Sequence, residues 1–201
     1  MLQRDTDPPL SERQRKMVDE AVRSCARLVE LIGEISDLSK LDSGALPLRG
    51  DRFDLFALLS ELATDVHEGE DREVRFRLSG PSDGALIVGD RPRMAAAFGV
   101  FIRAILREQP TAGTVVADRR MIVDKGQRSA TVVVAAEADV QRAYNGTPTA
   151  LNEKRGGIGL SLPIARRIVE RYGGRVWSPA PANADDRGLK SALVVSIPLG
   201  E

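Results

Sequence analysis

The sequence predicts an α+β fold, a two-layer α/β sandwich in which helices cover one face of a mixed sheet, preceded by a long dimerisation helix. Three observations support this prediction. A stripe of apolar residues at helical spacing occupies 11–41, alternating runs typical of strands recur after residue 72, and a glycine-rich segment at 154–159 leads into another amphipathic helix. With 201 residues, 42% of them apolar, the chain can bury the core that such a domain needs.

Composition and charge exclude several classes of function. The 29 Lys and Arg residues balance the 29 Asp and Glu residues, so nothing indicates a nucleic-acid partner or a membrane surface. The apolar runs are too short to span a bilayer and the first residues carry no signal-peptide pattern, so we expect a cytoplasmic protein with no membrane segment in this chain. The single cysteine, Cys25, excludes an internal disulfide and a multi-cysteine metal site, and its place on the apolar stripe predicts a small core residue.

The first helix is predicted to run from Ser11 to about Leu41. Ser11 and Gln14 match a capping box, and 42–44 supplies the stop. The apolar positions alternate steps of three and four, as in the seam of a coiled coil: Val18, Ala21, Cys25, Leu28, Ile32 and Ile35. About 1.5 Å per residue makes this helix a rod of roughly 45 Å, too long for one small domain to cover. We therefore expect a homodimer through the 11–41 helix, the alternative being a helix packed along its own domain.

The rest of the chain is predicted to alternate helices and strands. After a linker at 44–53, the expected elements are a helix capped by Asp54, strands at 73–78 and 85–88, a helix from Asp90, a hairpin of strands at 114–123 and 129–136, a helix ended by Gly173, and strands at 175–178 and 191–197. Trp177 is expected to be a core residue rather than a stacking platform. The polar stretch at 137–159 predicts an unstructured lid or binding loop.

The glycine-rich segment is a candidate phosphate-binding loop. Gly156, Gly157 and Gly159 let the backbone approach an anion, and the free N–H groups at the start of the following helix favour negative charge there. Lys154 and Arg155 stand beside the glycines, where they can pair with phosphate oxygens. The alternative is a tight turn into a packed helix, with both basic residues simply solvated.

The order of the elements and two motifs resemble the sensor histidine kinases. The segment from Gly156 to Gly174 is similar to their second glycine box and the helix behind it, in the ATP-binding domain shared with gyrase, the heat-shock chaperones and the mismatch-repair ATPases. The segment at 27–44, followed by 53–55, is similar to the second helix of their dimerisation hairpin and its connection to the ATPase domain. The resemblance implies a helical dimerisation segment at 1–45 and a histidine-kinase-like ATPase domain at 50–201.

Two departures from the family pattern fall in the nucleotide site. The family carries magnesium-binding asparagines on the helix that follows Asp90, where this chain has Val100 and either Arg103 or Ala104. A hydrocarbon cannot ligate magnesium, and an arginine repels it. The family's first glycine box supplies an aspartate that accepts from the adenine amino group.

This chain has a glycine-free stretch at 135–140 in place of that box, so the close turn is not encoded. Glu137 and Asp139 remain as acceptors for adenine. A third departure concerns the phosphoacceptor histidine, which the family carries on the first helix of the hairpin. That helix is absent here unless residues were removed before Met1, and the only histidine, His67, is expected in a loop. We therefore expect no autophosphorylation by the family's route.

These patterns favour a histidine-kinase-like phosphorelay protein whose kinase domain is degenerate, weak or inactive. It would act as a dimeric regulatory or docking module for a response-regulator receiver domain or a partner kinase. ATP or ADP is expected to bind weakly, at the residues named above and Leu160, without magnesium and without a catalytic residue. The alternatives are the C-terminal fragment of an active ATP-dependent sensor kinase and a dimeric histidine phosphotransferase lacking its first helix.

Overall fold

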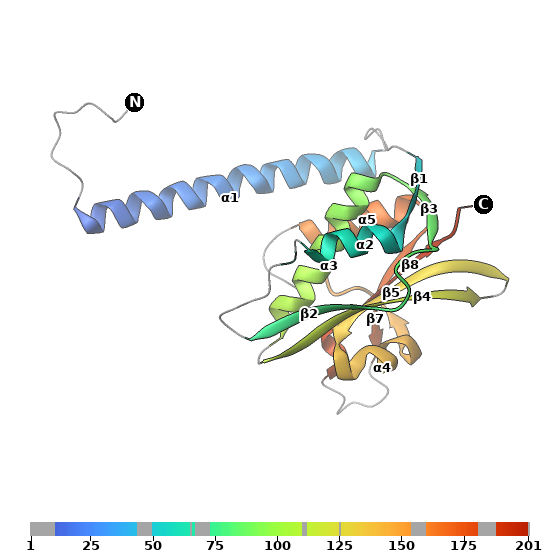
Figure 1. The fold of residues 1–201 in the computed structure, drawn as a ribbon. Helices are drawn as coiled ribbons and strands as arrows, with labels where there is room; N and C mark the ends of the chain where they lie inside the picture. The colour runs from blue at the N-terminus through green and yellow to red at the C-terminus, as the bar shows by residue number, and fades with distance from the viewer. Residues whose placement is uncertain are drawn as a thin grey trace.

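The computed structural model describes residues 11–43, 50–64, 66, 73–109, 112–124, 126–153, 160–180 and 188–200 (Figure 1). Its elements in chain order are α1 (Glu12–Asp42), β1 (Asp51–Asp54), α2 (Leu55–Thr64), β2 (Val74–Ser79), β3 (Leu86–Gly89), α3 (Arg91–Glu108), β4 (Gly113–Asp124), β5 (Gln127–Ala136), η2 (Glu137–Asp139), α4 (Val140–Asn145), β6 (Thr147–Thr149), α5 (Ser161–Arg171), β7 (Arg175–Ala180), η3 (Gly188–Ser191) and β8 (Leu193–Pro198).

A six-stranded mixed sheet forms the body of the molecule. The strand order is β2-β4-β5-β8-β7-β6, in which β2 pairs with β4 in parallel and the other pairs are antiparallel. Strands β1 and β3 form a separate antiparallel pair. The predicted α+β class with a mixed sheet is confirmed.

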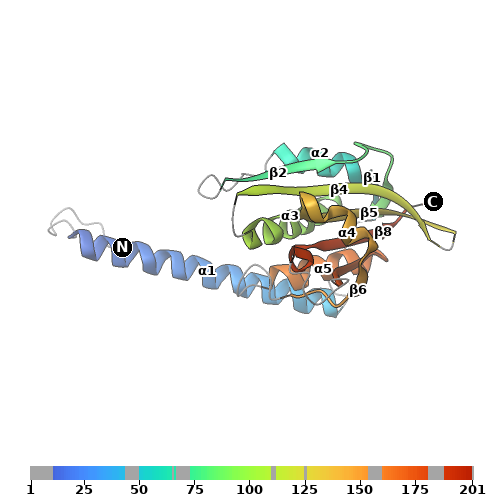
Figure 2. The same cartoon turned by 90° about the horizontal axis from the view of Figure 1, so that it is seen from below.

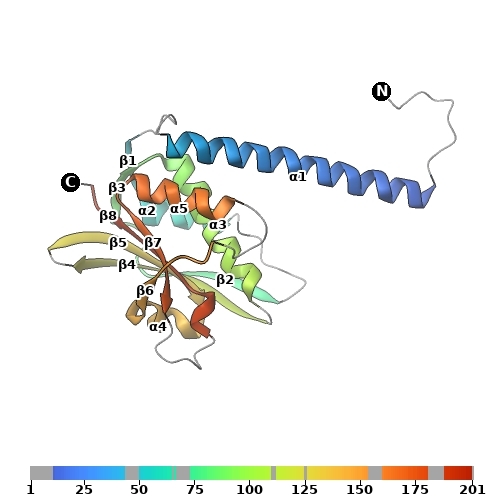
Figure 3. The same cartoon turned by 180° about the vertical axis from the view of Figure 1, so that it is seen from behind.

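The sheet has two unlike faces. Helices α2, α3 and α5 cover one of them, which we call the helix face, and the main core lies between these helices and the sheet (Figures 1 and 3). The opposite face, which we call the open face, carries α4 and a smaller core in which Val116, Val133 and Val194 pack with Val140 and Ala143. The sequence predicted helices on one face of the sheet only. Helix α4, on the open face, was not predicted.

The helix starts that the sequence predicted are confirmed by their hydrogen bonds. Oδ1 of Asp54 accepts from the backbone N–H groups of Phe56 and Ala57 at 2.8 and 3.2 Å, and Oδ1 of Asp90 accepts from that of Arg93 at 3.1 Å. Satisfying these N–H groups fixes where α2 and α3 begin. Ser11 and Gln14 likewise form the expected capping box before α1.

Two expectations about loops are wrong in the described part of the chain. The stretch at 137–159, predicted to be unstructured, contains η2, α4 and β6. Val140, Ala143 and Tyr144 hold α4 on the open face, and a helix of six residues is too short to show a clear helical period in the sequence. The linker expected at 44–53 ends in β1, a strand of four residues that is fixed by pairing with β3.

Helix α1 projects from the body as a long rod and contacts α5 (Figures 1 and 2). Its apolar stripe is exposed in the single chain, with exposed fractions of 47% to 70%: Met17, Val18, Val22, Leu28, Val29, Ile32 and Ile35. Cys25 is exposed as well, so it is not part of a core formed by this chain alone. Among the described helices, none is both long and apolar enough to cross a bilayer.

Candidate functional site

Helices α3 and α5 pack against each other on the helix face and frame the candidate nucleotide site. Their contact places Tyr172, just after α5, close to Asp90 and Arg93 at the start of α3. Burial, followed by the neighbouring carboxylate of Asp90, raises the pKa of the Tyr172 hydroxyl. The end of α5 is therefore anchored at the start of α3.

The glycine-rich segment itself lies outside the described residues, and this includes Lys154, Arg155, Gly156, Gly157 and Gly159. The structure shows how its two ends are held. Leu160, which is half-buried, accepts at its carbonyl from the backbone N–H of Ile164 at 3.0 Å and so starts α5. At the other end, Glu153 accepts from Arg166 of α5 at 2.8 Å.

Arg166 joins the segment to the helix behind it. Its guanidinium donates to both Glu153 and Glu170, the latter at 2.7 Å. The bond to Glu170 is the main reason that the pKa of Arg166 is raised. Because Glu153 and Leu160 are both fixed to α5, the intervening segment begins and ends at this helix. The pair of Glu153 with Arg166 could not be predicted from a local pattern, because thirteen residues separate its members.

The positions singled out on α3 differ in exposure. Val100 is half-buried, Ala104 is 4% exposed and Arg103 is exposed. The guanidinium of Arg103 lies back along the helix over Gly99, within 3.1 Å of the position that a Cβ would take there. None of the three residues carries a carboxamide or carboxylate oxygen, the ligand type that magnesium prefers.

Both acidic candidates for adenine recognition have arginine partners in the structure. Glu137 of η2 is exposed and forms an ion pair with Arg77 of β2. Arg77 lies on the opposite face of β2 from the residues that pack in the main core. Asp139 is buried and pairs with Arg142 of α4 at 2.6 Å. These contacts place Glu137 on the open face and Asp139 beside α4, whereas α3 and α5 lie on the helix face. Recognition of adenine by either residue stays a prediction.

Comparison with known proteins relates the chain to one family. It is 27% identical over 186 residues to the sensor protein SphS of Synechococcus elongatus, covering 83% of this chain and 43% of that protein. It is 26% identical to the sensor protein GacS of Pseudomonas syringae, covering 83% of this chain and 20% of that protein. No protein-family model matches the chain.

Solved structures share its fold. A histidine kinase from Burkholderia phymatum is 25% identical with a TM-score of 0.55, covering 90% of this chain and 85% of that one. The histidine kinase AdeS of Acinetobacter baumannii is 17% identical with a TM-score of 0.63, covering 98% and 89%. The proteins that the chain resembles in sequence are sensor proteins, and the solved structures that share its fold are histidine kinases.

The chain spans less than half of the length of SphS and about a fifth of GacS. The resemblance to the sensor histidine kinases predicts that Val100 and either Arg103 or Ala104 stand where that family carries magnesium-binding asparagines, and this correspondence stays a prediction. The structure shows three side chains there that supply no oxygen ligand, and one of them carries a positive charge. The fold is thus that of a histidine-kinase ATPase domain.

Proposed function

We propose that this chain is a dimeric regulatory module of two-component signalling, in which a histidine-kinase ATPase fold has weakened or lost its nucleotide chemistry. The observation that carries the proposal is the replacement on α3. Val100 and Ala104 offer hydrocarbon, and the guanidinium of Arg103 lies on the same helix. A magnesium ion bridging two phosphates needs oxygen ligands and is repelled by a cation, so magnesium-dependent binding of ATP is disfavoured here.

Partial phosphate binding is compatible with the geometry around α5. The dipole of this helix favours negative charge at its start, and the glycine-rich segment begins and ends at the helix. ATP or ADP would therefore bind weakly through Gly156, Gly157, Gly159 and the N-terminus of α5. Its phosphates would be neutralised by basic residues such as Lys154 and Arg155 rather than by magnesium.

The exposed stripe on α1 supports the proposed homodimer. Among the side chains of α1 that the structure describes, seven large apolar ones are exposed to solvent in the single chain, including Val29 at 70% and Ile32 at 66% exposure. Large contiguous apolar patches of this kind are uncommon on monomers and mark interfaces. A second copy supplies the same stripe, and the alternating steps of three and four suit the packing of one helix on another.

The proposed partner is a response-regulator receiver domain or a partner kinase. A structural neighbour, histidine kinase ThkA, was solved in complex with the response regulator protein TrrA, and it is 19% identical with a TM-score of 0.63. We assign residues 1–45 to dimerisation and docking and residues 50–201 to the ATPase-like domain. In this proposal α1, which projects from the body, is the element that both partners reach.

A phosphotransfer assay separates this proposal from an active kinase fragment. The chain would be incubated with radiolabelled ATP, magnesium and a separately produced dimerisation hairpin that carries the phosphoacceptor histidine of a sensor histidine kinase. The regulatory proposal predicts no label on the hairpin above that of a reaction without this chain, while the catalytic domain of the same kinase serves as the positive control. Transfer of label by this chain would establish an active ATPase domain and refute the proposal.

A further inference from the structure

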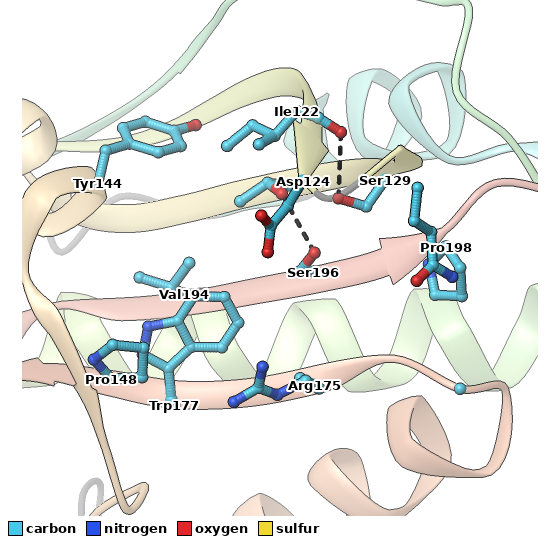
Figure 4. Close-up of a pocket in the computed structure, with 13 residues that line it drawn as sticks. Ile122, Asp124, Ser129, Tyr144, Pro148, Arg175, Trp177, Val194, Ser196 and Pro198 are labelled. Carbon is cyan, nitrogen blue, oxygen red and sulfur yellow. Dashed lines mark hydrogen bonds between the residues drawn. The ribbon is translucent and has the colours of Figure 1, made fainter.

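A hollow lies on the open face of the sheet, beside α4 and away from the candidate nucleotide site. It has a volume of about 360 Å³ and lies between the β4–β5 hairpin, β8, β7 and the α4–β6 segment (Figure 4). Its aromatic side is formed by Tyr144 and Trp177, and its polar side by Asp124, Thr131, Arg175 and Ser196. Ligand pockets start at about 300 Å³, so this volume suits one small molecule rather than a nucleotide or a peptide.

The aromatic side is fixed before any ligand arrives. The hydroxyl of Tyr144 donates to the carbonyl of Asp118 at 3.1 Å, and the guanidinium of Arg120 lies 3.9 Å from the centre of the Tyr144 ring. Arg120 is held in turn by Asp118 at 2.8 Å. Trp177 is half-buried against the smaller core. Rigid aromatic surfaces lose little conformational entropy on binding, which favours affinity.

The floor of the hollow is polar, although the same face of the sheet is apolar where α4 covers it. Under α4, β5 and β8 contribute Val133 and Val194 to the smaller core. Further along the same two strands stand Thr131 and Ser196, whose hydroxyls bond each other at 3.2 Å. Each hydroxyl keeps acceptor capacity for a third group. The hollow thus joins an aromatic half to a half lined with hydroxyl groups.

Two opposite charges line the hollow without a counter-ion. Asp124 of the hairpin and Arg175 of β7 are both exposed, and within the described part of the chain neither has an ion pair or a side-chain hydrogen bond. Arg175 is placed instead over the Trp177 ring, 5.6 Å from its centre. Figure 4 shows Asp124 and Arg175 on opposite sides of Ser196. A ligand that carries both an ammonium and a carboxylate group would satisfy both.

We propose that this hollow binds a zwitterionic aromatic molecule of the size of an α-amino acid. Its ring packs between Tyr144 and Trp177, its ammonium group faces Asp124 and its carboxylate faces Arg175. The hydroxyl of Ser196 lies between the two charged groups and bonds the polar end of the ligand. The site is independent of the proposed function, because it lies on the opposite face of the sheet from α3 and α5.

The experiment uses the only tryptophan of the chain as the reporter. Trp177 lines the hollow, so its fluorescence reports occupancy there. The full chain is titrated with L-phenylalanine, phenethylamine and phenylacetate, which share a ring and differ in charge. We expect a saturable change with L-phenylalanine and at least about tenfold weaker binding of the two analogues, since each lacks one charge-assisted hydrogen bond.

Substitution of the two charges completes the test. Arg175→Gln and Asp124→Asn should each weaken binding of L-phenylalanine about tenfold. Arg128→Gln removes a positive charge from an exposed residue of the same hairpin that does not line the hollow, and it should bind as the parent chain does. The proposal is overturned by an absence of saturable change with L-phenylalanine, by analogues that bind equally well, or by binding that both substitutions leave unchanged.

Discussion

The guanidinium of Arg103 lies over Gly99 on α3, where its Nη1 atom would stand 3.1 Å from a Cβ on that glycine. Gly99 is buried, and outside the backbone of its own helix the three atoms nearest to its vacant Cβ position belong to the flexible side chain of Arg103. One surface of α3 is therefore covered by a cation that reaches back one turn. This arrangement is a physical reason to expect nucleotide binding unlike that of a magnesium-dependent kinase.

Replacing Gly99 with alanine should stabilise the chain. Glycine inside a helix costs roughly 0.5–1 kcal/mol relative to alanine, and the new methyl group needs only a small displacement of the Arg103 guanidinium. We expect the free energy of unfolding, measured with urea, to rise by up to about 1 kcal/mol. Gly174→Ala is the matched contrast, because a Cβ there would stand 2.6 Å from Val169 and 3.0 Å from a backbone oxygen. A loss of stability in Gly99→Ala would show that Arg103 is rigidly held.

Ile32→Asp should disrupt the proposed homodimer. Ile32 is 66% exposed in the single chain and lies within the apolar stripe of α1, so a carboxylate there would be buried without a partner between two copies. Light scattering should report a monomer or an aggregate. Arg23→Asp places the same carboxylate on an exposed position of α1 outside the stripe and should leave the dimer intact. A dimer that survives Ile32→Asp would contradict the assignment of α1 to the interface.

Arg119→Met should be strongly destabilising. Arg119 is 5% exposed. It donates to the carbonyl of Phe56 at 2.9 Å, to the hydroxyl of Ser60 at 2.7 Å, and to the carbonyls of Ser79 and Gly80 at the end of β2. Burial lowers the pKa of the Arg119 guanidinium. The hydrogen bonds offset the cost of burying this charged group. Its removal leaves several buried acceptors unpaired, at a cost of about 2–4 kcal/mol.

The control for this substitution is Arg128→Met, which changes an exposed arginine and should alter the free energy of unfolding by less than about 0.5 kcal/mol. Urea denaturation of both variants makes the comparison. Equal changes in the free energy of unfolding for the two variants would mean that the hydrogen bonds from Arg119 to Phe56 and Ser60 do not hold α2 on the sheet.

Tyr144 should make the chain less stable in alkali. Burial, followed by the charge of Asp118, raises the pKa of its hydroxyl far above the unfolded value of about 10. Its contribution is therefore fully present below pH 10, and it is lost as the pH rises further, because the unfolded chain then releases a proton that the folded chain keeps.

Tyr144→Phe removes this loss along with the hydrogen bond to Asp118. At pH 8 the variant should be about 1 kcal/mol less stable than the parent chain, and above pH 10 the difference should shrink by up to about 1.4 kcal/mol per pH unit. Unfolding by urea at pH 8 and pH 11 measures the change. A difference that is the same at both pH values would mean that Tyr144 ionises normally in the folded chain.

Elements with a strong local signal could be predicted from the sequence. Carboxylate caps at Asp54 and Asp90 and long apolar periods marked α1, α2, α3 and α5 closely. Elements fixed by tertiary pairing could not. Strand β1 has four residues and depends on β3, and α4 depends on the packing of Val140, Ala143 and Tyr144 on the open face of the sheet.

The sites divide in the same way. Local spacing indicated the glycine-rich segment, and the resemblance to the sensor histidine kinases led to the prediction at Val100 and either Arg103 or Ala104. Both are local patterns, each on one stretch of the chain. It did not indicate that Glu137 pairs with Arg77, sixty residues away, or that Glu153 pairs with Arg166. The hollow beside Trp177 was also missed, since its lining comes from β4, β5, β7, β8 and the α4–β6 segment. Such surfaces exist only once distant strands are paired.

Calorimetric titration of the chain with ATP, with and without magnesium, tests the central claim most directly. A domain that has lost its magnesium ligands on α3 should bind ATP weakly or not at all, and addition of magnesium should not increase its affinity. ADP in place of ATP should behave in the same way. Micromolar binding of ATP that requires magnesium would contradict the account and identify an active nucleotide site.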